Sequence, residues 1–153
     1  MRAQKIIIIF ESVHQYNTKK IAQVIAQGLQ AELCRPEQIN SSALTDFDLI
    51  GIGSGIYYGK PHENIQHFLM HLPFLQGKKS FLFTTSGTLN QKSIELIQNE
   101  VEAKGMKVVD YFSCRGLNTH GPLKLVGGIN KGHPDLEDLQ HAEIFAKSLL
   151  NRL

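Results

Sequence analysis

Hydroxyl side chains and glycines gather in four short segments of this 153-residue chain, each directly after an apolar stretch. The segments are residues 11–18, 54–60, 84–88 and 113–119. Hydroxyl groups donate hydrogen bonds, and glycine lets a backbone approach a ligand closely. We therefore take these four segments as the candidate binding loops.

The first segment has the chemistry of a phosphate-binding loop. It joins an apolar stretch to a helical pattern, and the N-terminus of a helix presents unpaired N–H groups and a positive dipole end to an anion. Ser12, Asn17 and Thr18 add side-chain donors. Capping of the helix by Asn17 or Thr18 is the alternative, but capping alone does not call for Ser12 or for so long a loop. The segment has neither the dinucleotide glycine pattern nor the Gly-Lys-Ser/Thr of a P-loop.

The elements that must position these segments are strands alternating with helices. Residues 6–10, 49–53 and 81–83 are apolar or glycine at every position, which is typical of strands covered on both faces in a parallel sheet. Residues 108–112 predict a further strand, and residues 31–35 predict a weaker one near an edge of the sheet.

Four amphipathic patterns predict the helices. The first begins at Thr18, the second stops before Pro73, and the third closes with Gly105 in the C′ position. The last has Pro134 in its first turn, followed by acidic residues. Their apolar positions are Ile21, Val24, Ile25, Gly28 and Leu29; Ile65, Phe68, Leu69 and Leu72; Ile94, Ile97 and Val101; and Leu139, Ala142, Phe145, Ala146 and Leu149.

Five strands and four helices in strict alternation predict one α/β domain over residues 1–153, built on a doubly wound sheet. Ligands of such sheets bind at the carboxyl ends of the strands. All four candidate segments follow strands, so the topology is expected to bring them to one edge.

Composition excludes several other classes of protein. Apolar residues make up 42% and charged residues 20% of the chain, which excludes a disordered chain. The 16 Lys and Arg against 14 Asp and Glu are spread out, so we expect no nucleic-acid partner. No apolar run approaches the roughly 20 residues of a membrane span, and we expect a cytoplasmic protein. Cys34 and Cys114 match neither a disulfide scaffold nor a zinc motif.

Taken in order, the motifs resemble the flavodoxin family. Residues 8–12 with 17–22 resemble its signature, and residues 48–60 look like its second flavin loop. The similarity continues through residues 85–87 and the tail at 121–134, so it covers nearly the whole chain. The resemblance implies a five-stranded parallel sheet of order 2-1-3-4-5, helices on both faces, and one FMN bound without a covalent link.

The resemblance also implies which residues hold the flavin. They are Ser12, His14, Gln15, Tyr16, Asn17 and Thr18 at the phosphate; Ser54, Gly55, Ile56, Tyr57, Tyr58 and Gly59 beside the isoalloxazine; and Thr85, Ser86, Gly87 and Thr88 along its other side and polar edge. The chain has no Trp, so Tyr57 and Tyr58 are the candidates for stacking on the ring. Because they are adjacent, we expect one to face the flavin and the other to face away.

Two histidines and one long segment could serve roles other than holding the flavin directly. His67 and His71 lie one helical turn apart, a spacing that can bind a metal ion. Both fall on the polar side of their helix with no third ligand in view, so we predict no metal site. The segment 118–133 is predicted either to cover the flavin or dock a partner, or to cover an edge of the sheet.

Three function classes follow from the resemblance. The first is an FMN-binding redox protein that transfers electrons at low potential to a redox protein or a small molecule. The second is an FMN-dependent reductase or oxidase, of the quinone, NAD(P)H or protoporphyrinogen type. The third is an interaction module without FMN. The sequence shows no acid and base paired at a defined spacing, so we rank the electron carrier first. Because flavodoxins are ordinarily acidic and this chain is mildly basic, we expect a neutral or acidic partner.

Overall fold

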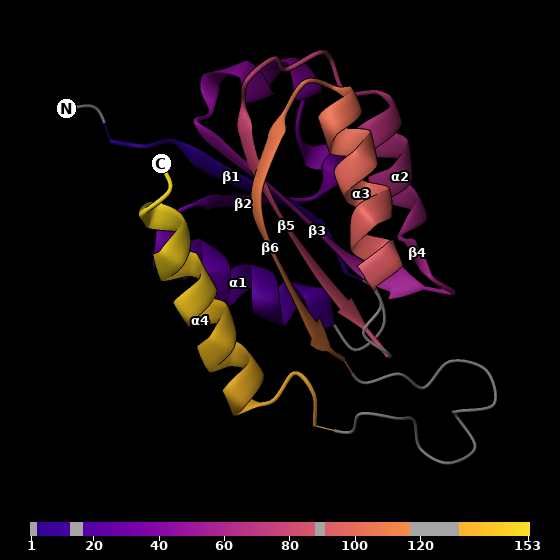
Figure 1. The fold of residues 1–153 in the computed structure, drawn as a ribbon, viewed down its shortest axis with the longest axis vertical. Helices are drawn as coiled ribbons and strands as arrows, with labels where there is room; N and C mark the ends of the chain where they lie inside the picture. The colour runs from indigo at the N-terminus through magenta and orange to yellow at the C-terminus, as the bar shows by residue number, and fades with distance from the viewer. Residues whose placement is uncertain (1–2, 13–16, 88–90, 117–131) are drawn as a thin grey trace.

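The computed structural model describes residues 3–12, 17–87, 91–116 and 132–153 (Figure 1). Within these residues, five parallel strands form the central sheet. They are β1 (Ile6–Glu11), β2 (Glu32–Cys34), β3 (Leu49–Tyr57), β5 (Lys79–Ser86) and β6 (Lys107–Arg115). Their order is β2-β1-β3-β5-β6, and a two-residue strand, β4 (Lys60–Pro61), pairs antiparallel with the end of β3. With β4 set aside, this is the predicted order 2-1-3-4-5.

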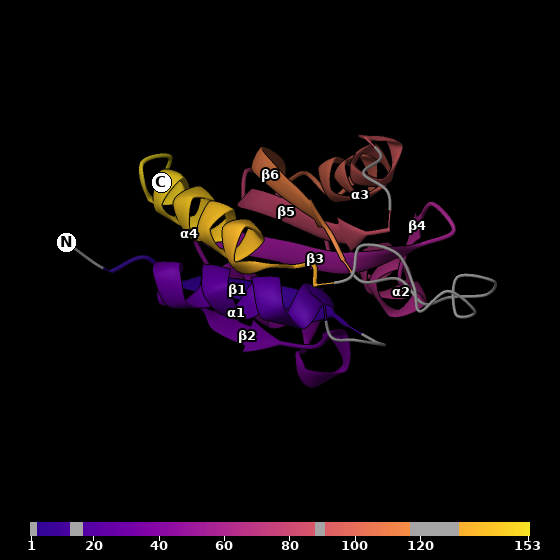
Figure 2. The ribbon, with the colours of Figure 1, turned by 90° about the horizontal axis from the view of Figure 1, so that it is seen from below.

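Helices cover both faces of the sheet, as predicted (Figure 2). On one face lie α1 (Asn17–Leu29) and α4 (Leu136–Leu150), and on the other lie α2 (Glu63–Met70) and α3 (Gln91–Ala103). Two short 3-10 helices, η1 (Pro36–Gln38) and η2 (Ser41–Asp46), join β2 to β3. In the described ranges, no helix combines the length and apolar character that a membrane span requires.

Every position of β1 is buried, because helices cover both of its faces. Ile6, Ile8 and Phe10 point toward α1 and α4, whereas Ile7 and Ile9 point toward α2 and α3. Successive side chains of a strand alternate between the two faces of a sheet. Since both faces are covered, the whole run is apolar, and the prediction of a doubly covered strand is confirmed.

Glycines in β3 make room for aromatic rings on β5. Gly51 is paired with Phe81 and Gly53 with Phe83. A Cβ atom on Gly51 would lie 2.3 Å from Cζ of Phe81, and one on Gly53 would lie 2.0 Å from Cζ of Phe83. The two rings therefore lie across the glycines, which fixes the register of the two strands that end at the candidate site.

The strands run further toward the carboxyl edge than the sequence indicated. Glu11, residues 54–57, residues 84–86 and residues 113–115 were expected in loops, but they lie in β1, β3, β5 and β6. The backbone of a hydroxyl residue pairs as well as that of an apolar one, so the change in polarity along these segments does not mark the end of the strand.

The start of α4 also differs from the prediction. Asp135 is the N-cap and exchanges hydrogen bonds with Asp138, so Pro134 precedes the helix and does not lie in its first turn. The end of α3 is as predicted, because Gly105 follows it with a φ of +87°, which only glycine adopts easily.

Candidate functional site

Buried hydroxyl groups lie at the carboxyl ends of β1, β3 and β5 and in the first turn of α1. They belong to Ser12, Thr18, Ser54, Thr84, Thr85 and Ser86, each at most 8% exposed. Ser12, Thr18 and Thr85 cluster at the start of α1, whereas Ser54 and Thr84 alternate to the α2 face of the sheet. The ends of neighbouring parallel strands meet at one edge of a sheet, which is where ligands of doubly wound folds bind. The topology therefore brings residues from three of the candidate segments together.

Two hydrogen bonds tie the first turn of α1 to this edge. Oγ1 of Thr18 lies 2.8 Å from Oγ1 of Thr85. Oγ of Ser12 accepts a hydrogen bond from the backbone N–H of Lys19 at 3.1 Å. A hydroxyl that accepts one bond keeps its own proton to donate, so both contacts leave a donor for a ligand. The first turn of α1 holds no acidic side chain, so nothing in that turn opposes an anion at the positive end of the helix dipole.

The chain leaving β6 closes against the same corner. The N–H of Gly116 donates to the carbonyl of Ser86 at 3.0 Å. A Cβ atom on Gly116 would lie 2.5 Å from Nδ2 of Asn17, so any larger residue would displace that side chain. The carboxyl ends of β5 and β6 therefore meet the start of α1 at Asn17 and Gly116.

The end of β3 turns back on itself to form the second part of the site. Tyr57 pairs with Lys60 across a two-residue turn, in which Tyr58 has a φ of +52° and Gly59 a φ of +79°. Positive φ at both positions is the pattern of a type I′ turn. Glycine adopts it freely, whereas Tyr58 does so at a cost on the order of 1 kcal/mol.

Hydrogen bonds fix this turn to the neighbouring helices. Oγ of Ser54 donates to the carbonyl of Gly55 at 2.6 Å and accepts from the N–H of His62 at 2.8 Å. Oγ of Ser93 donates to the carbonyl of Gly59 at 3.3 Å. His62 is the N-cap of α2, where its side chain accepts a hydrogen bond from the N–H of Asn64. The turn is thus held at both of its ends.

The two adjacent tyrosines have different surroundings. Tyr58 is 84% exposed. Tyr57 is half-buried, its ring stands edge-on to His62 with centroids 5.7 Å apart, and its hydroxyl lies 2.5 Å from where a Cβ on Gly55 would be. Which of the two rings contacts a flavin stays a prediction.

Sequence reasoning missed the part played by Glu11. Its carboxylate is only 2% exposed, accepts a hydrogen bond from Nδ2 of Asn64 at 3.0 Å, and lies 3.7 Å from Nη1 of Arg35. Alternation along β1 turns it to the α2 face, away from Ser12 and α1. Glu11 therefore joins β1 to α2 and to the end of β2. The signal in the sequence was an acidic residue continuing an apolar run.

Neither cysteine is poised as a nucleophile. Burial, with a smaller contribution from Asp138 and Asp135, raises the pKa of Cys114 to about 12. Burial raises the pKa of Cys34 to about 11, with Glu32 and Glu37 adding to the effect. The thiolate is the reactive form of cysteine, so both side chains are inert thiols at neutral pH.

A charged cluster lies at the start of α4. Nδ1 of His133 lies 2.6 Å from Oδ2 of Asp138, which also accepts from the N–H of Asp135 at 2.9 Å. The hydrogen bond to Asp138 raises the pKa of His133. The hydrogen bond from the backbone of Asp138 lowers the pKa of Asp135.

The predicted cofactor residues fall into three groups in the structure. Ser12, Asn17, Thr18 and Thr85 come together at the start of α1. Ser86 ends β5, where its carbonyl accepts from the N–H of Gly116, and Gly87 follows it. Ser54, Gly55, Ile56, Tyr57, Tyr58 and Gly59 form the end of β3 and its turn. His14, Gln15, Tyr16 and Thr88 lie outside the described residues, as does the segment 118–133 except for its last two residues.

Comparison with known proteins agrees with the observed fold. A family model described as a flavodoxin domain matches residues 7–120. An uncharacterized protein of Methanocaldococcus jannaschii is 39% identical over 148 residues, which is 95% of this chain and 98% of that protein.

Solved flavodoxins share the fold. A flavodoxin from the domain Archaea superposes with a TM-score of 0.73 at 20% identity, over 97% of both chains. Flavodoxin 2 from Bacillus cereus superposes with a TM-score of 0.75 at 20% identity, over 97% of this chain and 99% of that one. With a family model matching most of its length, this chain belongs to the flavodoxin family.

Proposed function

We propose that the chain binds one FMN at the carboxyl edge of its sheet and carries electrons between redox partners. Bound FMN supplies one-electron and two-electron transfer. The observation that carries the proposal is the cluster of buried hydroxyl groups around the first turn of α1, because this cluster fits a phosphate monoester.

The donor set suits a doubly charged phosphate. Ser12 and the Thr18–Thr85 pair each keep a hydroxyl proton to donate, and the first turn of α1 adds backbone N–H groups and its dipole. Ser12, Thr18 and Thr85 are each at most 3% exposed, so water competes weakly for these donors. The carboxylate of Glu11 points to the other face of the sheet, where it accepts from Asn64 and lies beside Arg35.

The turn after β3 supports the isoalloxazine half of the proposal. Tyr57 and Tyr58 give this turn two aromatic rings with different exposure, and hydrogen bonds from Ser93 and to Ser54 hold the turn in place. A ring stacked on the flavin contributes roughly 0.5–1.5 kcal/mol beyond its burial. The side chains of this turn would orient the flavin and exclude water from it.

Substitution of Thr18 tests where the phosphate lies. Thr18→Val keeps the shape of the side chain but removes its hydroxyl. A hydrogen bond to a charged group contributes about 1.5–3 kcal/mol, so we expect FMN to bind about ten to a hundred times more weakly. Riboflavin has no phosphate, and its affinity should change little.

Thr45→Val is the matched control, because Thr45 is exposed in η2 and its hydroxyl donates to the carbonyl of Ser42 in the same turn. Its affinities for both ligands should equal those of the unmodified chain. If Thr18→Val weakened the binding of FMN and riboflavin equally, the phosphate would not bind beside Thr18.

A second experiment separates the carrier from a flavin reductase. The protein loaded with FMN is mixed with NADH or NADPH alone, and the flavin absorbance is followed. A carrier should be reduced only when a reductase is added. Multiple turnovers of NADH or NADPH by the protein alone would favour the enzyme.

A further inference from the structure

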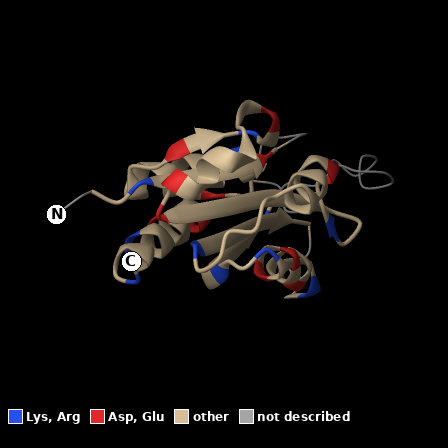
Figure 3. Cartoon of the chain, turned by 90° about the horizontal axis from the view of Figure 1, so that it is seen from above, with Lys and Arg blue, Asp and Glu red and all other residues tan. Residues whose placement is uncertain are grey.

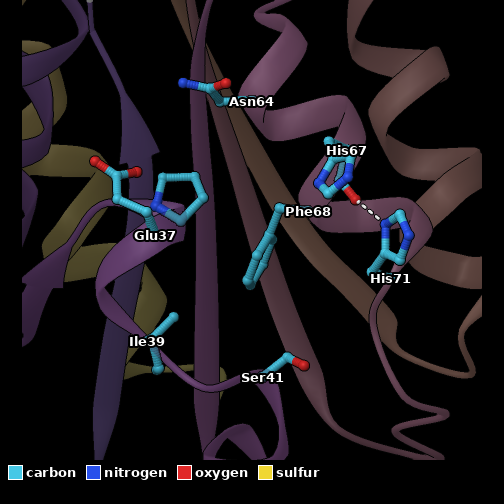
Figure 4. A pocket seen from close by; sticks show the side chains of 8 residues that line it. Glu37, Ile39, Ser41, Asn64, His67, Phe68 and His71 are labelled. Atoms are coloured by element: carbon cyan, nitrogen blue, oxygen red, sulfur yellow. Dashed lines mark hydrogen bonds between the residues drawn. The ribbon is translucent and has the colours of Figure 1, made fainter.

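A groove separate from the hydroxyl cluster lies between η1, η2 and α2 (Figure 4). Its volume is about 420 Å³, within the range of small-ligand sites. Glu37, Ile39 and Ser41 line it from the chain that follows β2, and His67, Phe68 and His71 line it from α2 and the residue that ends it.

The two imidazoles lie side by side at the wall of this groove. His67 is in the last turn of α2, and His71 is the C-cap, one helical turn later. Their rings are stacked, with centroids 4.2 Å apart and planes at 30°. Both side chains are exposed, so an ion can reach them. Two histidines spaced by four residues on one helical face can present their nitrogens to a single metal ion.

A hydrogen bond sets which nitrogen of His71 is free. Nδ1 of His71 lies 2.9 Å from the backbone carbonyl of His67, the bond drawn in Figure 4. A carbonyl oxygen can only accept, so Nδ1 carries the proton and Nε2 of the neutral ring keeps its lone pair. A ring nitrogen that donates to a backbone carbonyl is the usual support of a metal-binding histidine, because it fixes the tautomer and the ring orientation.

The charges along the groove also favour a cation. The described residues that line it include no lysine or arginine, and Glu37 contributes a carboxylate. The nitrogens of imidazole suit zinc, copper and nickel, whereas magnesium and calcium prefer sites made only of oxygen.

We propose that His67 and His71 together bind one divalent transition-metal ion through Nε2, with water completing its coordination. The spacing alone did not lead us to predict a metal site. The stacked rings, the fixed tautomer and the open groove are what the structure adds. This site is independent of the flavin and does not rest on the proposed electron transfer.

Titration of the full-length protein with Ni²⁺ tests the proposal. After treatment with a chelator, the unmodified chain, His67→Asn and His71→Asn are compared by calorimetry. We expect one site in the unmodified chain. Loss of an outer-shell partner of a metal ligand typically costs about 10–100-fold in affinity, so loss of a ligand itself should cost at least about tenfold in each variant. Circular dichroism confirms that both variants fold, which is expected because both side chains are exposed.

His141→Asn is the matched control, since His141 is an exposed helical histidine on α4 whose neighbour at four residues is Glu137. Its Ni²⁺ affinity should equal that of the unmodified chain. With Cu²⁺ as a second probe, electron paramagnetic resonance should show two imidazole nitrogens in the unmodified chain and fewer in the two variants. Ni²⁺ affinity that is the same in all four proteins would overturn the proposal.

Discussion

Thr18 and Thr85 make the contact that joins the first turn of α1 to the end of β5. The two hydroxyls are buried and 2.8 Å apart, although 67 residues separate them in the sequence. Such a bond could not be read from the sequence, because residue types near a turn do not say which of them meet. The presence of donors around the first helix start was predictable; their pairing was not.

A double-mutant cycle measures this contact. Thr18→Val or Thr85→Val each leaves the other hydroxyl buried without its partner, so each should lower the free energy of unfolding by about 1–3 kcal/mol. The double variant removes both hydroxyls and should lose less than the sum of the two. Urea denaturation of the four proteins without flavin gives these values, and strict additivity would show that the two side chains do not interact.

His133 gives the molecule a pH dependence with a defined sign. The hydrogen bond to Asp138 raises its pKa above the ordinary 6.5, so the folded state holds the proton more tightly than the unfolded state does. The stabilisation is complete below about pH 6.5 and is lost as the pH rises through the raised pKa.

The variant His133→Gln checks this account. Denaturation midpoints of the unmodified chain should fall between about pH 6 and pH 9 by more than those of the variant. His141→Gln is the control for replacing a histidine on α4, since His141 is exposed and lies 4.0 Å from an exposed glutamate. Parallel curves for His133→Gln and the unmodified chain would mean that this contact does not stabilise the fold.

At the scale of the elements, the apolar patterns predicted the four α-helices and five main strands that the described residues form. The β-branched run of β1 and the spacing in α3 are local signals that packing reinforces. The strand ends were misjudged, because we took the change from apolar to hydroxyl residues as the end of pairing. The backbone of β3 and β5 pairs on through Ser54 and Thr84. Glu11 joins β1, β2 and α2, a contact between distant segments that no local pattern shows.

Gly53 offers a test of how β3 and β5 fit together. Gly53→Ala places a methyl group against the ring of Phe83, where the nearest atom would be 2.0 Å away. Overpacking of this kind costs typically 1–3 kcal/mol, so the free energy of unfolding should fall by about that amount or more.

A second substitution, Phe83→Leu, distinguishes overpacking against the ring from other effects of placing alanine at position 53. In the Phe83→Leu background, Gly53→Ala should be less costly, because the ring that it strikes is gone. If the cost of Gly53→Ala is the same in both backgrounds, the ring does not fill the space above this glycine.

At the scale of the whole molecule, charge of both signs is spread over the described chain (Figure 3). The formal net charge is +2. The helix starts at the carboxyl edge carry Lys19 and Lys92 as well as Glu63 and Glu137, so no single sign dominates there. Electrostatic steering needs a field of one sign, and it raises association rates by roughly 10 to 10³-fold where it exists.

We therefore expect slow reduction of the FMN-loaded protein by a basic flavodoxin reductase, with little dependence on salt. Stopped-flow measurements over a series of salt concentrations give the rates. An acidic or neutral reductase should reduce the protein at least as fast as the basic one. Fast reduction by the basic reductase that collapses as salt is added would reveal an acidic docking surface.

The most direct test of the flavin site compares two ligands on the unmodified chain. Protein freed of flavin is titrated with FMN and with riboflavin, and the quenching of flavin fluorescence gives the two dissociation constants. The hydroxyl cluster at the start of α1 predicts one bound FMN, held about ten to a hundred times more tightly than riboflavin because only FMN carries the phosphate. Equal affinities for the two ligands, or no binding of FMN, would contradict the proposed site.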